Sequence, residues 1–163
     1  MDDSVVRANE GVDHFAGPAR PLVREDSMAD QDIAVVPLLS VRNGTRAIEF
    51  YKTAFGAREV FRVDNEKGEV VARLSVGHAE FWLADESPPH GNFSPESLGG
   101  GTVRLLLILE DPDAAFQRAV AAGATVVWPV GNQHGWRVGR VVDPFGHHWE
   151  ICKPLSSTQP IVT

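Results

Sequence analysis

The chain has 163 residues, 43% of them hydrophobic and 23% charged, values that are ordinary for one globular domain or for two similar halves. Its formal net charge of -7 argues against the basic surface with which proteins bind nucleic acid or anionic membranes. No stretch approaches the roughly 18 apolar residues of a membrane-spanning helix, and the single cysteine, Cys152, excludes an intramolecular disulfide. We therefore expect a cytoplasmic protein without nucleic-acid or membrane partners.

The first half of the chain begins with a segment of low regularity and continues with a strand and a helix. Residues 1–30 mix charges with Gly and Pro, which predicts a flexible or loosely packed arm. The β-branched run from Ile33 to Val41 predicts a strand, in which Pro37 indicates an edge or a bulge. Thr45 is positioned to cap a helix that Gly56 ends.

Three strands and a long connection follow this helix. The strands are predicted at Glu59–Val63, Val70–Val76 and Glu80–Ala84, because β-branched and aromatic residues alternate there between turn residues. Residues 85–101 are rich in Pro, Gly and Ser and predict a loop. We thus expect a βαβββ module over 31–86 and a linker over 87–101.

The second half repeats this order over residues 102–155. The predicted strands are Thr102–Leu109, Thr125–Trp128, Trp136–Val142 and Trp149–Cys152, with a helix at Ala114–Ala122 and a polar loop at Gly131–Gly135. The helix ends Ala-Phe-Gly-Ala and Ala-Ala-Gly-Ala superpose at a spacing of 67, which also places Trp82 on Trp149. The sequence predicts an α+β fold of two tandem modules in a single domain, 31–155, with a tail at 156–163.

Three segments carry a resemblance to a known family: Ala47-Ile-Glu-Phe-Tyr-Lys-Thr-Ala-Phe-Gly-Ala57, the helix region from Glu110 to Ala124, and Asp143-Pro-Phe-Gly-His147 followed by Trp149-Glu150. Together and in this order they resemble the vicinal oxygen chelate superfamily, which contains glyoxalases, bleomycin-resistance proteins and extradiol dioxygenases. The resemblance implies a glyoxalase-like fold with curved mixed sheets around a cavity, often closed by a partner subunit. In the enzymes of the family, four side chains in this cavity hold a divalent metal.

The resemblance also implies where the four metal ligands would lie: at Val36 or Pro37, at Leu83 or Phe81, at Arg104 and at Glu150. Glu150 matches the family. A guanidinium only donates hydrogen bonds and cannot bind a cation, so Arg104 does not match. The first-module positions lack donor atoms, and the nearest acid, Glu80, is expected on the opposite side of its strand. Three of the four ligands are therefore missing.

We expect Arg104 to replace the metal by forming a charge-assisted pair with Glu150 inside the cavity. The alternative is an Arg104 side chain that points into solvent. His148 shares the strand face of Glu150, but two ligands are fewer than a stable divalent site needs. A rearranged metal site that recruits His90 or His134 stays open as the other alternative.

Further cavity residues are expected from His134-Gly135-Trp136-Arg137, which combines an imidazole, an indole and a guanidinium. Flat rings beside a cation suit a planar or anionic small molecule, although Trp136 could equally pack in the core or in a dimer interface. Trp82 and Trp149 are predicted to pack against the helices.

The sequence thus predicts a small-molecule binding protein that works without a metal or other cofactor. It resembles bleomycin-resistance proteins and would sequester a ligand as a homodimer. The predicted ligand contacts are Arg104, His134, Trp136, His148 and Glu150. The alternative is a glyoxalase- or dioxygenase-like enzyme with a rearranged metal site or with Glu150 as catalytic general base. Whether the modules pair within one chain or across a dimer stays open.

Overall fold

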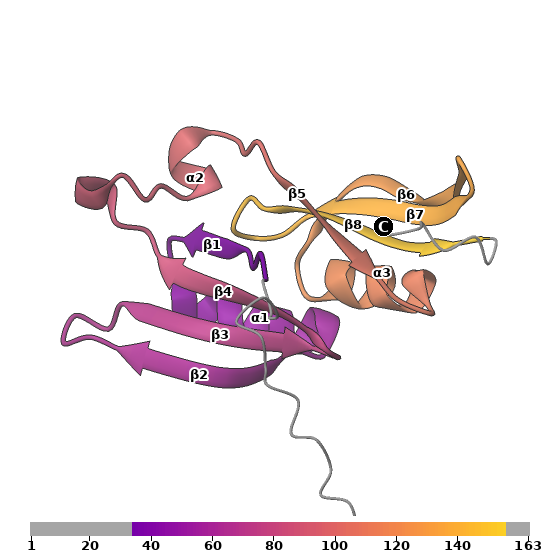
Figure 1. Ribbon diagram of the computed structural model, residues 1–163. Coiled ribbons are helices and arrows are strands. Elements are labelled where there is room, and N and C mark those ends of the chain that lie inside the picture. Colours follow the sequence, from indigo (N-terminus) through magenta and orange to yellow (C-terminus); the bar gives the residue numbers. More distant parts are fainter. Residues whose placement is uncertain (1–33, 156–163) are drawn as a thin grey trace, which may run out of the picture. The chain divides into compact units, whose positions relative to one another are not determined.

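The computed structural model describes residues 34–155, so the predicted arm and tail lie outside the described residues. Two βαβββ modules follow each other along the chain (Figure 1). The first contains β1 (Leu38–Val41), α1 (Gly44–Phe55), β2 (Arg58–Asp64), β3 (Val70–Val76) and β4 (Ala79–Asp85). The second contains β5 (Arg104–Ile108), α3 (Pro112–Ala121), β6 (Thr125–Gln133), β7 (Trp136–Val142) and β8 (His148–Pro154). The predicted α+β fold of tandem modules is confirmed.

Each module forms its own four-stranded mixed sheet, with the strand orders β1-β4-β3-β2 and β5-β8-β7-β6. The first and last strands of a module are parallel neighbours, and the other pairs are antiparallel. Strands β1 and β5 therefore lie at the edges of their sheets. No helix in the described part of the chain is long and apolar enough to cross a membrane.

Side chains alternate between the two faces of each sheet. One face is buried against α1 in the first module and against α3 in the second. We call the other face of the first sheet, which carries Arg73, Glu80 and Trp82, the first open face. The corresponding face of the second sheet, which carries Arg140 and Glu150, is the second open face.

Local sequence sets the ends of α1. The Asn43 side chain accepts a hydrogen bond from the Arg46 amide, so Asn43 caps the helix and the predicted cap at Thr45 is wrong by two positions. The predicted end is confirmed, because Gly56 adopts φ 66° and closes the helix.

The second helix, α3, begins where the sequence places a capping acid and a proline. Asp111 accepts from the Ala114 amide, and Pro112 occupies the first turn. On β7, a Cβ at position 139 would lie 2.8 Å from the Phe116 ring. Gly139 therefore lets α3 pack close to its sheet.

Two predicted loops differ from the structure. The linker contains a short helical turn at Pro88–His90 and the helix α2 (Pro95–Leu98). Ser94 caps α2, and hydrogen bonds from the Ser94 amide and the Ser97 hydroxyl lower the pKa of Glu86 to about 2. The predicted loop at residues 131–135 is wrong at its start, because β6 stays paired with β7 as far as Gln133 after two register shifts.

A buried carboxylate connects the two modules. Asp143 is 3% exposed and accepts from the Tyr51 hydroxyl at 2.6 Å and from the Trp149 indole at 2.9 Å. Its other oxygen accepts from the amides of Phe145 and His147, both at 2.9 Å. Burial, and then the charge of Asp143, raise the pKa of the Tyr51 hydroxyl well above its ordinary value. The Asp-Pro-Phe-Gly turn before β8 is thus fixed to α1.

Candidate ligand site

The second open face brings the predicted arginine and acid together. Strand register places Leu106 opposite Glu150, so Arg104, two residues earlier on β5, shares its face. Arg104 Nε lies 3.3 Å from Glu150 Oε1, and the two side chains are 56% and 19% exposed. The predicted ion pair is therefore present, although more than half of the Arg104 side chain also meets solvent. Such a pair contributes little to stability, so a ligand can rearrange it at low cost.

A second arginine lies on the same face and is held by an imidazole. Arg140 donates to His148 Nδ1 from Nε at 3.1 Å and from Nη2 at 2.8 Å. Because a guanidinium only donates, Nδ1 carries no proton and the ring is neutral. Burial, and then the charge of Arg140, lower the pKa of His148, which agrees with a neutral ring. Arg140 also lies over the Trp128 ring at 5.0 Å.

The Arg140–Trp128 pair was not predicted from the sequence. Trp128 was expected only to end a strand before Pro129, and the register shifts in β6 are what place it on the second open face beside Arg140. The alternation of side chains along β7 could have placed Arg140 on the second open face, because Arg140 lies directly opposite Glu150.

A cavity of about 220 Å³ lies over this face. It is lined by Leu106, Trp128, Gln133, His134, Trp136, Val138, Glu150 and Cys152. The predicted contacts Glu150, Trp136 and His134 therefore border one hollow, whereas Arg104 and His148 lie on the same face beside it. Cys152 is buried, and burial raises the pKa of its thiol.

The guanidinium of Arg137 takes no part in this cavity. It bonds to Asp113 of α3, on the helix side of the sheet. The expectation that the segment from His134 to Arg137 brings a cation to the ligand is wrong, because Arg137 alternates to the opposite face from Trp136.

The structure corrects the predicted parity of β4. Trp149 packs in the core as expected, at 4% exposure. Trp82 lies instead on the first open face, beside the Phe61 ring at 5.7 Å, while Phe81 and Leu83 are buried on the helix side. The spacing of 67 taken from the helix ends is out of register with the strands by an odd number of residues, and such a slip exchanges the two faces of a strand.

The position of Glu80 also differs from the position expected from the sequence. This side chain lies on the first open face without any bulge and approaches Arg73 Nη1 at 3.6 Å. Arg73 in turn lies over the Trp82 ring at 5.6 Å. The implied ligand positions at Phe81 and Leu83 therefore point away from an open face.

The donors on the second open face do not fit a divalent metal. Within residues 34–155 no group of three or more His, Cys, Asp or Glu side chains could hold a metal ion. Of the candidate donors, one oxygen of Glu150 faces Arg104, and Nδ1 of His148 accepts from Arg140. His90 bonds to the Ser87 hydroxyl at 2.7 Å, within the linker.

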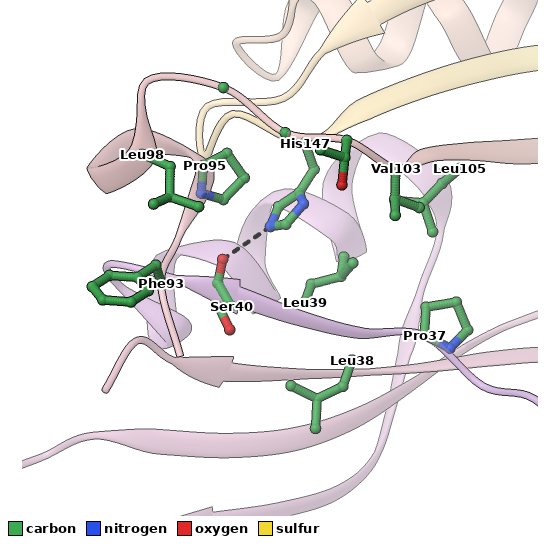
Figure 2. A pocket seen from close by; sticks show the side chains of 13 residues that line it. Pro37, Leu38, Leu39, Ser40, Phe93, Pro95, Leu98, Val103, Leu105 and His147 are labelled. Carbon is green, nitrogen blue, oxygen red and sulfur yellow. Dashed lines mark hydrogen bonds between the residues drawn. The ribbon is translucent and has the colours of Figure 1, made fainter. Parts of the chain in front are cut away.

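A second hollow, of about 390 Å³, lies between β1 and β5 (Figure 2). Its lining is mainly apolar and includes Leu38, Phe93, Leu98 and Val103. His147, the one titratable side chain among the described residues that line it, bonds through Nε2 to the Ser40 carbonyl at 3.0 Å (Figure 2). The imidazole of this groove is already bonded to a backbone carbonyl, so we place the candidate site on the second open face, where charged and aromatic side chains meet.

Several known proteins are similar to this chain in sequence and in fold. The uncharacterized protein Rv0887c of Mycobacterium tuberculosis is 41% identical over 136 residues, which cover 80% of each chain. The crystal structure of the Arabidopsis thaliana At5g48480 gene product is 29% identical, with a TM-score of 0.58 over 75% of this chain and 98% of that one. The structure of TioX from Micromonospora sp. ML1 is 26% identical, with a TM-score of 0.56 over 75% of this chain and 100% of that one. The family model of the Glyoxalase/Bleomycin resistance protein/Dioxygenase superfamily matches residues 32–151, and the chain belongs to this superfamily.

Proposed function

We propose that this protein binds a small molecule in the cavity of the second open face and does so without a metal. The observation that carries the proposal is the arrangement around Glu150. This carboxylate lies in a hollow with two indole rings, and Arg104 takes the place beside it that a cation would need. A mainly apolar hollow with few polar groups is typical of a small-molecule site.

A homodimer in the cytoplasm is part of the same proposal. Leu38 on β1 and Leu106 and Ile108 on β5 are 59%, 56% and 58% exposed. These apolar side chains lie on the edge strands of the two sheets, and exposed apolar patches and unpaired strand edges are the surfaces that proteins cover by association. A second copy would cover them and enclose the open faces. Sedimentation at micromolar concentration tests this expectation, and a monomer would contradict it.

The ligand is found by a thermal-shift screen of aromatic and heteroaromatic compounds on the full chain. A ligand that binds only the folded state raises the melting temperature in proportion to the logarithm of its concentration. We expect Trp136→Ala and Glu150→Gln to reduce this shift. Glu110→Gln, an equal change of charge on an exposed residue in the loop after β5, should leave it unchanged. Equal shifts in all variants would exclude this cavity.

Elemental analysis of the purified protein tests the absence of a catalytic metal. We expect less than about one tenth of an equivalent of Zn, Ni, Mn or Fe per chain. A surface that does not offer three or four metal ligands should not retain a metal ion through purification. About one equivalent that is lost in Glu150→Ala would overturn the metal-independent proposal and favour an enzyme.

A further inference from the structure

The second open face carries an arginine, Arg140, that is held by a neutral imidazole. Building on the proposed function, we infer that the ligand of the second open face is a flat aromatic acid. Its carboxylate, or a similar oxyanion, is bound by Arg140 and by the indole N–H of Trp128, and its ring lies in the cavity of the same face.

The charges on the second open face favour an anionic ligand. Arg104 lies beside the carboxylate of Glu150, so these two charges compensate each other. Arg140 is held by Nδ1 of His148, which is neutral because it accepts from the guanidinium. An arginine that is fixed by a neutral acceptor keeps its full charge. The second open face therefore carries one positive charge in excess.

The indole N–H of Trp128 is an unused donor. The Trp128 indole N–H is buried and has no hydrogen-bond partner within residues 34–155. Buried indole N–H groups nearly always have a partner. Trp128 lines the cavity and lies under the Arg140 guanidinium. A carboxylate is purely an acceptor and can take bonds from both groups at once.

The shape and polarity of the rest of the cavity lining favour a flat apolar ring. Leu106, Val138 and Trp136 offer apolar surface, and the hollow of about 220 Å³ suits a body of one or two rings. Flat rings pack well against indole faces. A ligand with a ring and an acid group would use both the apolar lining and the excess charge.

Three naphthalene probes of matched size test the inference: 2-naphthoate, 2-naphthylmethylamine and 2-naphthalenemethanol. Their dissociation constants are measured by titration calorimetry on the full chain at pH 7.5. We expect the acid to bind at least about tenfold more tightly than the amine or the alcohol, since a hydrogen bond to a charged group contributes a factor of this order.

Two variants and one control assign the effect to the named groups. Arg140→Gln should weaken 2-naphthoate about tenfold or more and leave the alcohol almost unchanged. Trp128→Phe keeps a ring but removes the N–H, and should weaken the acid about threefold to tenfold. Arg46→Gln, an equal change of charge on the exposed surface of α1, should leave all three probes unchanged.

The outcomes separate this inference from the proposed function. Binding of all three probes with equal affinity overturns the aromatic acid but leaves a small-molecule cavity. Preference for the amine overturns it in favour of recognition by Glu150. Failure of all three probes to bind overturns the inference and counts against the cavity as well, in which case the thermal-shift screen decides whether any small molecule binds there.

Discussion

The two open faces are built alike and differ in what holds their arginines. Arg73 lies over Trp82 at 5.6 Å, and Arg140 lies over Trp128 at 5.0 Å. On the first face the arginine approaches the Glu80 carboxylate at 3.6 Å, so its charge is compensated. On the second face it donates to the neutral imidazole of His148. The comparison shows that an arginine stacked on an indole is not by itself a ligand site, because its partner decides whether charge is left for a ligand.

The largest expected effect is a loss of stability when the carboxylate that accepts hydrogen bonds in each module, Asp143 or Asp85, is removed. Asp143 accepts four hydrogen bonds and joins the turn before β8 to Tyr51 of α1. Asp85 of the first module accepts two, from the amides of Gly44 and Val70. Asp143→Ala should lower the free energy of unfolding by about 3–5 kcal/mol, because it leaves several buried donors without partners. Asp85→Ala should lower it by about 1–2 kcal/mol.

Urea denaturation of both variants measures the difference. A matched third variant, Tyr51→Phe, removes one donor and keeps the ring, and should cost about 1–2 kcal/mol. Equal losses for Asp143→Ala and Asp85→Ala would show that the second face depends no more on its buried acid than the first.

A smaller effect is expected when Arg140 is given a carboxylate partner, as Arg73 has on the first open face. In His148→Glu, a carboxylate replaces the neutral acceptor and compensates Arg140. The affinity for 2-naphthoate should fall about tenfold, while the affinity for 2-naphthalenemethanol should stay within about twofold. Calorimetry with the same probes measures both values.

The matched change on the first face is Glu80→Gln, which leaves Arg73 without its acid. We expect the affinity of the second face for 2-naphthoate to be unchanged. A gain of about tenfold in that affinity would contradict the independence of the two faces, because it would bring Arg73 to the same ligand as Arg140.

The sequence was sufficient to predict the fold because its local signals agree. Gly56 ends a helix and Val70–Val76 alternates as a strand does, and both are confirmed. The second helix was predicted from Ala114 and begins two residues earlier, at Pro112. Asn43 was missed as a cap because Thr45 carries a side chain of similar capping ability two positions later. The spacing of apolar residues therefore predicted which segments are helices and strands, and only the residues at which they begin and end had to come from the structure.

The candidate site was harder to predict because it depends on strand parity. The Arg104–Glu150 pair was predicted from the ligand positions that the family resemblance implies, and the structure contains it. Trp82 was placed on the wrong face because the spacing of 67, which matches the helix ends, is out of register between β4 and β8 by an odd number of residues. Trp128 was missed because two register shifts in β6 decide its face, and bulges leave no clear sequence signal.

The smallest expected effect is a pH dependence of stability that only the second face should show. The folded protein lowers the pKa of His148, first through burial and then through the charge of Arg140. Arg104 and His147 lower it further, and Asp143 opposes them. The unfolded chain titrates near 6.5 and therefore takes up a proton before the folded chain does. As the pH falls below about 6.5, the free energy of unfolding should decrease until the lowered folded pKa is reached. His148→Gln offers an amide oxygen to Arg140 but does not titrate, so its urea midpoint should fall less between pH 7.5 and 5 than that of the wild type. Parallel curves for the two proteins would contradict a neutral His148 and, with it, the uncompensated charge of Arg140 that distinguishes the second face from the first.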